Sequence, residues 1–111
     1  MPTVRLLQSL LTPYRLRFHE LALAEWRKLD GSVREVLKKK LAERIENPRV
    51  PAAALSGMPD CYKIKLRQQG YRLIYRVDDD IVFVTVIAVG RRDKNRAYDA
   101  AQSRIDDVVN D

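Results

Sequence analysis

The chain has 111 residues, of which 46% are hydrophobic and 32% are charged, a composition typical of one folded domain. Its 21 Lys and Arg residues exceed its 15 Asp and Glu residues, and the formal net charge of +6 favours acidic partners such as nucleic acid, the ribosome or an acidic protein. The single cysteine, Cys61, excludes an internal disulfide and a cysteine-based metal cage. The longest apolar run, Ile81–Val89, is too short to span a membrane, so no membrane partner is expected.

The first 13 residues, MPTVRLLQSLLTP, contain a short Leu-rich patch that Gln8 and Ser9 interrupt. No small-residue cleavage site of the secretory type follows the patch. We therefore interpret residues 1–13 as an N-terminal extension and residues 14–111 as the folded domain, and we expect a cytoplasmic location.

The N-terminal half of the domain predicts one strand and two helices. Tyr14–Phe18 alternates apolar and polar residues, which indicates a half-buried strand, and Glu20–Leu29 has apolar residues at helical spacing. Ser32, followed three residues later by Glu35, predicts the N-cap of a second helix that continues to about Glu46. Apolar residues at i, i+3/i+4 spacing predict its buried side: Val33, Val36/Leu37, Leu41 and Ile45. The connection between the two helices is about three residues long, so they are expected to form an antiparallel hairpin.

From Cys61 onward the apolar period changes to two, which predicts three further strands. The first begins at Cys61, the second is Tyr71–Val77, and the third is the β-branched run Ile81–Val89, whose composition favours a central position. Ala97–Val109 is predicted to form the last helix. The predicted fold is α+β: an antiparallel sheet, made of a meander plus the N-terminal strand, packed against a helical hairpin with a short C-terminal helix.

The register of the first hairpin follows if Gln69 and Gly70 form a two-residue loop. Leu66 then faces Leu73 and Ile64 faces Tyr75 on one side of the sheet, whereas Arg67 faces Arg72 and Lys63 faces Arg76 on the other. Like charges placed opposite each other are destabilising, and an anionic ligand would relieve the repulsion.

Basic residues are concentrated between Tyr62 and Tyr98, where nine of them against four Asp carry a charge of +5 out of the chain's +6. The nine are Lys63, Lys65, Arg67, Arg72, Arg76, Arg91, Arg92, Lys94 and Arg96. The meander should bring five of them, Lys65, Arg67, Arg72, Arg91 and Arg92, to one end of the sheet, next to the start of the last helix. The sequence therefore predicts a site for a polyanion, with Tyr98 beside it.

Such a cluster suits RNA cleavage without a metal ion, which requires a base for the 2′-hydroxyl, cations for the phosphate and an acid for the leaving oxygen. Crowded cations lower the pKa of a lysine or a phenol, so Lys63, Lys65 or Tyr98 could act as the base, and Arg92 or a lysine as the donor. No metal or cofactor is expected.

Other chemistry-bearing residues have simpler interpretations. We interpret the single histidine, His19, as structural, Cys61 as a partly buried thiol and Trp26 as a core residue. Asp78, Asp79 and Asp80 are expected to form a solvated turn. The basic side of the second helix, with Arg34 and Lys38–Lys40, is expected to face solvent.

Three segments resemble the RelE family of bacterial toxins: LAEWRKLDGSVREVLKKKL, LSGMPDCYKIKLRQQGYRLIYRV and VIAVGRRDKNRAY. The resemblance covers about Tyr14–Ile105. It implies an mRNA endonuclease that acts in the A site of the 70S ribosome, and a RelB-like antitoxin that neutralises it. It also implies that toxin and antitoxin together repress their own operon, so that operator DNA is contacted only through the complex.

The resemblance assigns roles to residues at matching positions. Lys63 and Lys65 match the family's strand lysines, which contact phosphate and transfer protons, and Arg72 matches its transition-state arginine. Arg92 matches the proposed general acid or phosphate clamp, and Tyr98 matches the terminal tyrosine that stacks on or activates the nucleotide. The remaining basic residues are expected to bind RNA or the ribosome: Arg67, Arg76, Arg91, Lys94 and Arg96.

One position departs from the family pattern. Family members often have arginine just before GMPD, where this chain has Ser56. Either a substrate or ribosome contact is missing, or a neighbour such as Arg49 compensates.

Two other functions stay open at the level of sequence. A ParE-like toxin of the same fold would inhibit gyrase by protein contact and would not need the set Lys63, Lys65, Arg72, Arg92 and Tyr98. A non-catalytic RNA- or ribosome-binding domain would show salt-dependent binding without cleavage.

Overall fold

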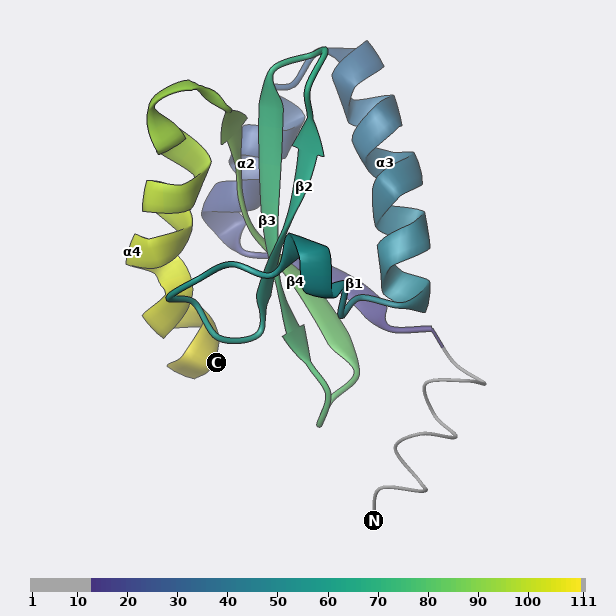
Figure 1. Ribbon diagram of the computed structural model, residues 1–111, viewed down its shortest axis with the longest axis vertical. Helices are drawn as coiled ribbons and strands as arrows, with labels where there is room; N and C mark the ends of the chain where they lie inside the picture. Colours follow the sequence, from purple (N-terminus) through teal and green to yellow (C-terminus); the bar gives the residue numbers. More distant parts are fainter. Residues whose placement is uncertain (1–12, 111) are drawn as a thin grey trace.

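A computed structural model describes residues 13–110, in which a four-stranded sheet lies between two helical layers (Figure 1). The strands are β1 (Arg15–Phe18), β2 (Cys61–Leu66), β3 (Tyr71–Asp78) and β4 (Phe83–Arg91), and the α-helices are α2 (Glu20–Arg27), α3 (Gly31–Glu46) and α4 (Arg96–Asn110). Short 3-10 turns are η1 (Pro51–Ala53) and η2 (Asp93–Asn95). The predicted α+β class is confirmed. The predicted N-terminal extension, apart from its last residue, lies outside the described residues.

The sheet has the order β1-β4-β3-β2, and β2, β3 and β4 form the predicted antiparallel meander. β1 pairs in parallel with β4, from Arg15 opposite Phe83 to Phe18 opposite Val86, so the sheet is mixed and not antiparallel throughout. The central position predicted for the β-branched strand is confirmed. Its bounds differ from the prediction because residues 79–82 complete the preceding turn, with Ile81 48% exposed and Val82 at a φ of +58°.

The two helices of the N-terminal half follow each other in opposite directions on one face of the sheet (Figure 1). His19 caps α2, because its Nδ1 accepts a hydrogen bond from the backbone N–H of Leu21 at 3.1 Å. The prediction that Ser32 caps α3 was wrong. Asp30 is the N-cap, its carboxylate accepting from the backbone N–H of Ser32 at 3.2 Å, so the helix begins one residue before Ser32. Hydrogen bonds from Ser32 lower the pKa of Asp30.

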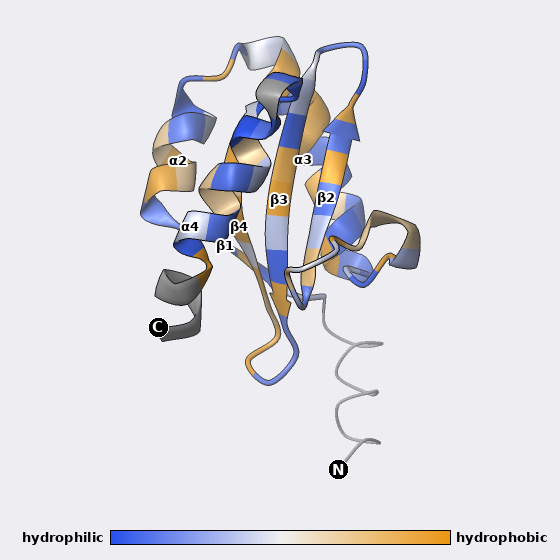
Figure 2. Cartoon of the chain, turned by 60° about the vertical axis from the view of Figure 1, so that its left-hand side comes forward, coloured by the Kyte–Doolittle hydropathy of each residue, from blue (hydrophilic) through white to orange (hydrophobic). Residues whose placement is uncertain are grey.

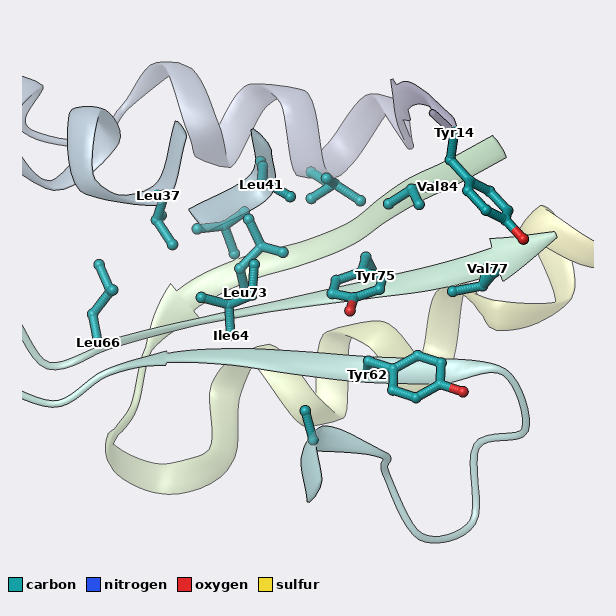
Figure 3. Close-up of a cluster of buried hydrophobic side chains, with 14 of the residues drawn as sticks. Tyr14, Leu37, Leu41, Tyr62, Ile64, Leu66, Leu73, Tyr75, Val77 and Val84 are labelled. Carbon is teal, nitrogen blue, oxygen red and sulfur yellow. The ribbon is translucent and has the colours of Figure 1, made fainter. Parts of the chain in front are cut away.

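Two hydrophobic clusters lie on opposite faces of the sheet. The larger one joins α2 and α3 to β3 and β4, with Leu37, Leu41, Leu73, Tyr75 and Val84 among its buried members (Figure 3). The spacing of Val33, Leu37 and Leu41 predicted from the sequence is the buried side of α3. The smaller cluster lies under α4 and joins Ala97 and Ala101 to Ile74, Ile87 and Ala88. Among the described residues, no helix is both long and apolar enough to cross a membrane.

The register of the β2–β3 hairpin differs from the prediction by two residues. The loop comprises residues 67–70, with Gly70 at a φ of +75° and its N–H donating to the carbonyl of Leu66 at 2.9 Å. Lys65 therefore faces Arg72, and Cys61 faces Arg76. A shift of two leaves every side chain on its predicted face, so alternation alone could not distinguish the two registers.

Candidate functional site

The candidate site lies where the β2–β3 loop, the end of β4 and the start of α4 meet. In the register of the sheet, Lys65 lies opposite Arg72 and Arg72 lies opposite Gly90, on the face that α4 covers. Figure 2 shows hydrophilic colouring over the β2–β3 loop and the first turns of α4. The N–H of Arg92 donates to the carbonyl of Gly70 at 2.8 Å and thereby fastens the end of β4 to the loop.

α4 begins close to the sheet, above Gly90. A Cβ atom at Gly90 would lie 3.6 Å from the backbone nitrogen of Ala97. The helix therefore starts directly above β4, and Tyr98, in its first turn, lies against the same sheet face as Lys63 and Ile74. Tyr98 therefore shares a sheet face with Lys63, Lys65 and Arg72.

Four cations act electrostatically on the exposed ammonium group of Lys65. The charge of Lys63 is the largest cause that lowers the pKa of Lys65, followed by desolvation and then by Arg67, Arg72 and Arg92. The structure thus brings together four of the five basic residues expected at this end of the sheet. Like charges held this close repel one another, and a phosphate group bound between them would relieve the repulsion.

Arg72 is partly fixed by a residue that the sequence analysis did not single out. Its Nη1 donates to Oδ1 of Asn95 at 3.3 Å, and Asn95 has a φ of +52°. The Nε of Arg72 is buried and has no acceptor within the described part of the chain. One end of the guanidinium group is therefore positioned, while its buried Nε–H group has no partner within the described residues. An asparagine in a turn tolerates the left-handed region, and that was the signal available in the sequence.

Tyr98 contacts the loop that precedes β2. Its hydroxyl donates to the carbonyl of Ser56 at 3.2 Å, and its ring packs with Met58 and the cluster under α4. Ser56, the residue that departs from the family pattern, thus contributes a backbone carbonyl to the edge of the site. Gly57, at a φ of +83°, lets the loop turn next to the tyrosine.

Two of the predicted RNA-binding residues lie apart from this group. Arg91 faces the other side of the sheet, where its guanidinium lies over the ring of Tyr71 at 5.4 Å. Arg76 is four residues along β3 from Arg72, beside Cys61. Arg67 and Arg96 are exposed near the site, and the side chain of Lys94 lies outside the described residues.

Arg49 does not compensate for Ser56. Its guanidinium forms ion pairs with Asp60 and Asp79, each at 2.9 Å, and donates to the hydroxyl of Tyr62 at 3.2 Å. Asp79 also accepts from Tyr14 at 2.6 Å, so the prediction of a merely solvated acidic turn was wrong for this residue. These contacts fix the loop between α3 and β2 to the opposite end of the sheet.

Most of the other residues with simple interpretations behave as expected, and Arg34 is the exception. Cys61 is 1% exposed, and burial raises its pKa to about 11, which describes an unreactive thiol. Trp26 packs against Phe18 with ring centroids 5.3 Å apart. The lysines of α3 are exposed, whereas Arg34 donates to the carbonyl of Leu29 at 3.0 Å.

Comparison with known proteins identifies the family. A protein-family model described as "ParE toxin of type II toxin-antitoxin system, parDE" matches residues 16–96. The chain is also 59% identical over 92 residues to "mRNA interferase toxin RelE" of Escherichia coli, covering 83% of this chain and 97% of the relative. This chain belongs to the RelE/ParE family of toxins. The resemblance found in the sequence is thereby confirmed.

Solved structures agree with this assignment. Isolated E. coli RelE has a TM-score of 0.71 and 58% identity, covering 83% of this chain and 98% of that chain. The toxin in the intact E. coli RelBE toxin–antitoxin complex has a TM-score of 0.69 and 63% identity, covering 70% of this chain and 95% of that chain. A "Putative RelE-like toxin protein" of E. coli is 45% identical over 92 residues, covering 83% of this chain and 97% of the relative.

Proposed function

We propose that this protein is the toxin of a type II toxin–antitoxin pair and that it cleaves mRNA in the A site of the ribosome, which stops translation. The observation that carries the proposal is the 59% identity to an mRNA interferase, over a segment that includes the whole cation cluster. Since ribosomes and mRNA are cytoplasmic, the activity is expected in the cytoplasm.

The reaction we propose is an attack of a 2′-hydroxyl on the adjacent phosphorus, without a metal ion. The hydroxyl loses its proton, the bond to the 5′ oxygen breaks, and that oxygen takes up a proton as it leaves. The products are a 2′,3′-cyclic phosphate and a 5′-hydroxyl. The negative charge that develops on the phosphate is the species that a fixed group of cations stabilises.

The residues around Lys65 supply these functions. Lys63 and Lys65 contact the phosphate and transfer a proton, and the lowered pKa of Lys65 favours the neutral amine that a base requires. Arg72, with Asn95 on one side and an N–H group left over, stabilises the transition state. Arg92 serves as general acid or phosphate clamp, and the ring of Tyr98 stacks on a nucleotide.

The remaining basic residues serve in binding. Arg67, Lys94 and Arg96 belong to segments that border the site, where they would contact the RNA backbone. Arg91, on the other face of the sheet, is proposed to contact the ribosome and not the reacting nucleotides.

We further propose a RelB-like antitoxin as the partner that neutralises this toxin. The support is the intact E. coli RelBE complex, whose toxin is 63% identical to this chain. With that antitoxin the protein is proposed to repress its own operon, so that operator DNA is bound only through the complex. An exposed basic surface suits an acidic partner that folds on binding.

The experiment that tests the function is primer extension on an mRNA held in a programmed 70S ribosome. We expect the wild-type protein to cut within the A-site codon and Arg92→Ala to leave the message intact. Circular dichroism should show that the variant is folded, because the side chain is exposed. Cleavage that EDTA abolishes, in ribosomes kept intact with polyamines, would contradict the metal-independent reaction.

The gyrase-directed alternative makes the opposite prediction. The name of the matching family model is its support. An intact message together with gyrase-dependent DNA breaks would replace the proposed function by that of a ParE-like toxin. An intact message with ribosome binding alone would indicate a non-catalytic domain.

A further inference from the structure

A second group of arginines lies on the α4 face of the sheet, at the end away from the candidate site. Arg17 lies opposite Thr85, and Thr85 lies opposite Arg76, so the two arginines flank one threonine in a row across three strands. Arg15 lies two residues before Arg17 on the same strand, opposite Phe83, and therefore points to the same face. We call Arg15, Arg17 and Arg76 the arginine row.

Phe83 holds two members of the arginine row in place. The guanidinium carbons of Arg15 and Arg17 lie 5.5 and 4.8 Å from the centroid of its ring. Arg17 is fixed further, because its Nε donates to Oγ1 of Thr85 at 2.7 Å. Arginines that are already ordered lose less entropy when they bind an anion.

Arg76 has donors that are buried and unused. Its Nε and Nη1 are removed from solvent and have no acceptor within the described part of the chain. Three other partly buried arginines have acceptors, Arg44 in Tyr75, Arg49 in Asp79 and Arg104 in Glu25, whereas Arg72 of the candidate site shares the unpaired Nε. A buried donor without an acceptor costs free energy, and an acceptor that draws the guanidinium group outward would recover it.

The acidic residues near Arg76 are engaged with other partners. Asp60 and Asp79 pair with Arg49, and Oδ1 of Asp78 accepts from the backbone N–H groups of Asp80 and Ile81 at 3.1 and 3.4 Å. These residues line a polar hollow next to Arg76. No described carboxylate forms an ion pair with any member of the arginine row. The arginine row therefore forms no ion pair within the described chain. Four carboxylates line the hollow beside Arg76, whereas Arg15 and Arg17 do not line it.

From this arrangement we propose that the arginine row is a second RNA-binding surface, which holds the phosphate backbone of ribosomal RNA while the candidate site holds the mRNA. The inference rests on the proposed function, which places the protein inside the ribosome. Arg72 and Arg76 are four residues apart, about 13 Å along β3. Between them the sheet is covered by Tyr98 and by the loop that carries Met58, so one strand of mRNA does not lie continuously over both surfaces.

Arginine suits this role, because its fork of donors contacts phosphate oxygens in pairs and its charge does not titrate near neutral pH. Contacts of this kind fix position and do not read sequence. The arginine row would therefore set how firmly and in which orientation the toxin sits in the ribosome, without changing which codon is cut.

Equilibrium binding of fluorescently labelled protein to vacant 70S ribosomes, over a range of salt concentrations, tests the inference. The variant Arg15→Gln/Arg17→Gln/Arg76→Gln removes three charges from the row. Its matched control, Lys38→Gln/Lys39→Gln/Lys40→Gln, removes three from the exposed side of α3. We expect the row variant to bind at least tenfold more weakly than the control, with a salt slope smaller by about one for each phosphate that the variant no longer neutralises.

Several outcomes would overturn the inference. Equal weakening by the two triple variants would show a general charge effect, and wild-type affinity of the row variant would show that the row binds no ribosomal RNA. Weakened binding of a single-stranded RNA oligonucleotide or of an acidic peptide, with unchanged ribosome binding, would assign the row to another partner. Arg15→Gln, at an exposed position, should weaken binding alone, so the result does not depend on the folding of the triple variant.

Failure of the inference can be told from failure of the proposed function. If the wild-type protein cuts mRNA on the ribosome and the row variant binds ribosomes as tightly as wild type, the second surface is rejected and the interferase function stands. Wild-type protein that neither binds ribosomes nor cuts would reject both.

Discussion

Arg104 and Glu25 form an ion pair that joins α4 to α2 across the edge of β4. Nη2 of Arg104 lies 2.8 Å from Oε2 of Glu25, and Nη1 donates to Oε1 at 2.9 Å. The same two side chains bond the backbone of β4: Oε1 accepts from the N–H of Val89 at 3.1 Å, and Nη1 donates to the carbonyl of Ile87 at 3.0 Å. β1 pairs with β4 only as far as Val86. Beyond that point the ion pair supplies hydrogen-bond partners for backbone groups of β4 that no longer have a neighbouring strand.

We therefore expect Glu25→Ala and Arg104→Ala each to lower the free energy of unfolding by about 2–3 kcal/mol, because each leaves a charged group of the pair and a backbone group of β4 without a partner. Chemical denaturation measures the change. The double variant Glu25→Ala/Arg104→Ala should lose less than the sum of the two single variants. Additive losses would show that the side chains act independently.

Lys65 is expected to titrate below the usual range of a lysine. Its pKa is lowered first by the charge of Lys63, and the substitution Lys63→Gln should therefore move it back upward. NMR titration of the Lys65 side chain measures both values. The folded state disfavours the charged form of Lys65, so its folded pKa lies below the unfolded value of 10.5. The contribution of Lys65 to stability therefore becomes more favourable as pH rises from the folded pKa toward 10.5.

A matched control for this prediction is Lys39→Gln, which removes an exposed charge from α3. It should leave the titration of Lys65 unchanged. If Lys65 is the base, the pH at which cleavage reaches its plateau should rise with its pKa in Lys63→Gln. An unchanged pH profile, together with a raised pKa, would assign the base to another group.

The sequence predicted the faces of the elements better than their ends. The spacing of Val33, Leu37 and Leu41 identified the buried side of α3 because burial of three apolar residues per two turns leaves few alternatives. Asp30 and Ser32 are both good N-cap residues, so the choice between them depended on the tertiary path of the chain.

In the candidate site, too, the sequence predicted the general position of residues better than their exact contacts. The position of Lys65, Arg72 and Arg92 at one end of the sheet followed from the order of strands and loops, which the sequence contains. The partner of Arg72 across the strand depended on the length of the loop, and a shift of two residues keeps the alternation intact. The engagement of Arg49 by two aspartates is a contact between distant segments, and no local pattern predicts it.

Cys61 is expected to be unreactive in the folded protein, because it is 1% exposed and its pKa is raised to about 11. A thiol reagent such as DTNB should label it slowly at pH 8 and rapidly after denaturation. The unfolded thiol ionises near pH 9 and the folded one near 11, so the contribution of Cys61 to stability falls as pH rises through this interval. Cys61→Ala should remove this part of the pH dependence and leave cleavage intact. Rapid labelling of the native protein would contradict the burial of the thiol.

Tyr98 is expected to act through its ring more than through its hydroxyl. The hydroxyl already donates to the carbonyl of Ser56, which fixes the side chain against the loop that precedes β2. Tyr98→Phe should therefore keep cleavage within about tenfold of wild type. Tyr98→Ala, which removes the stacking surface, should lose about a hundredfold or more, the range that stacking and positioning contributions reach.

The two variants separate stacking from proton transfer. Single-turnover cleavage in programmed ribosomes measures the chemical step, and thermal unfolding checks that the cluster under α4 is intact. If Tyr98→Phe loses as much activity as Tyr98→Ala while remaining folded, the hydroxyl takes part in proton transfer. The contact with Ser56 would then have to break when the nucleotide binds.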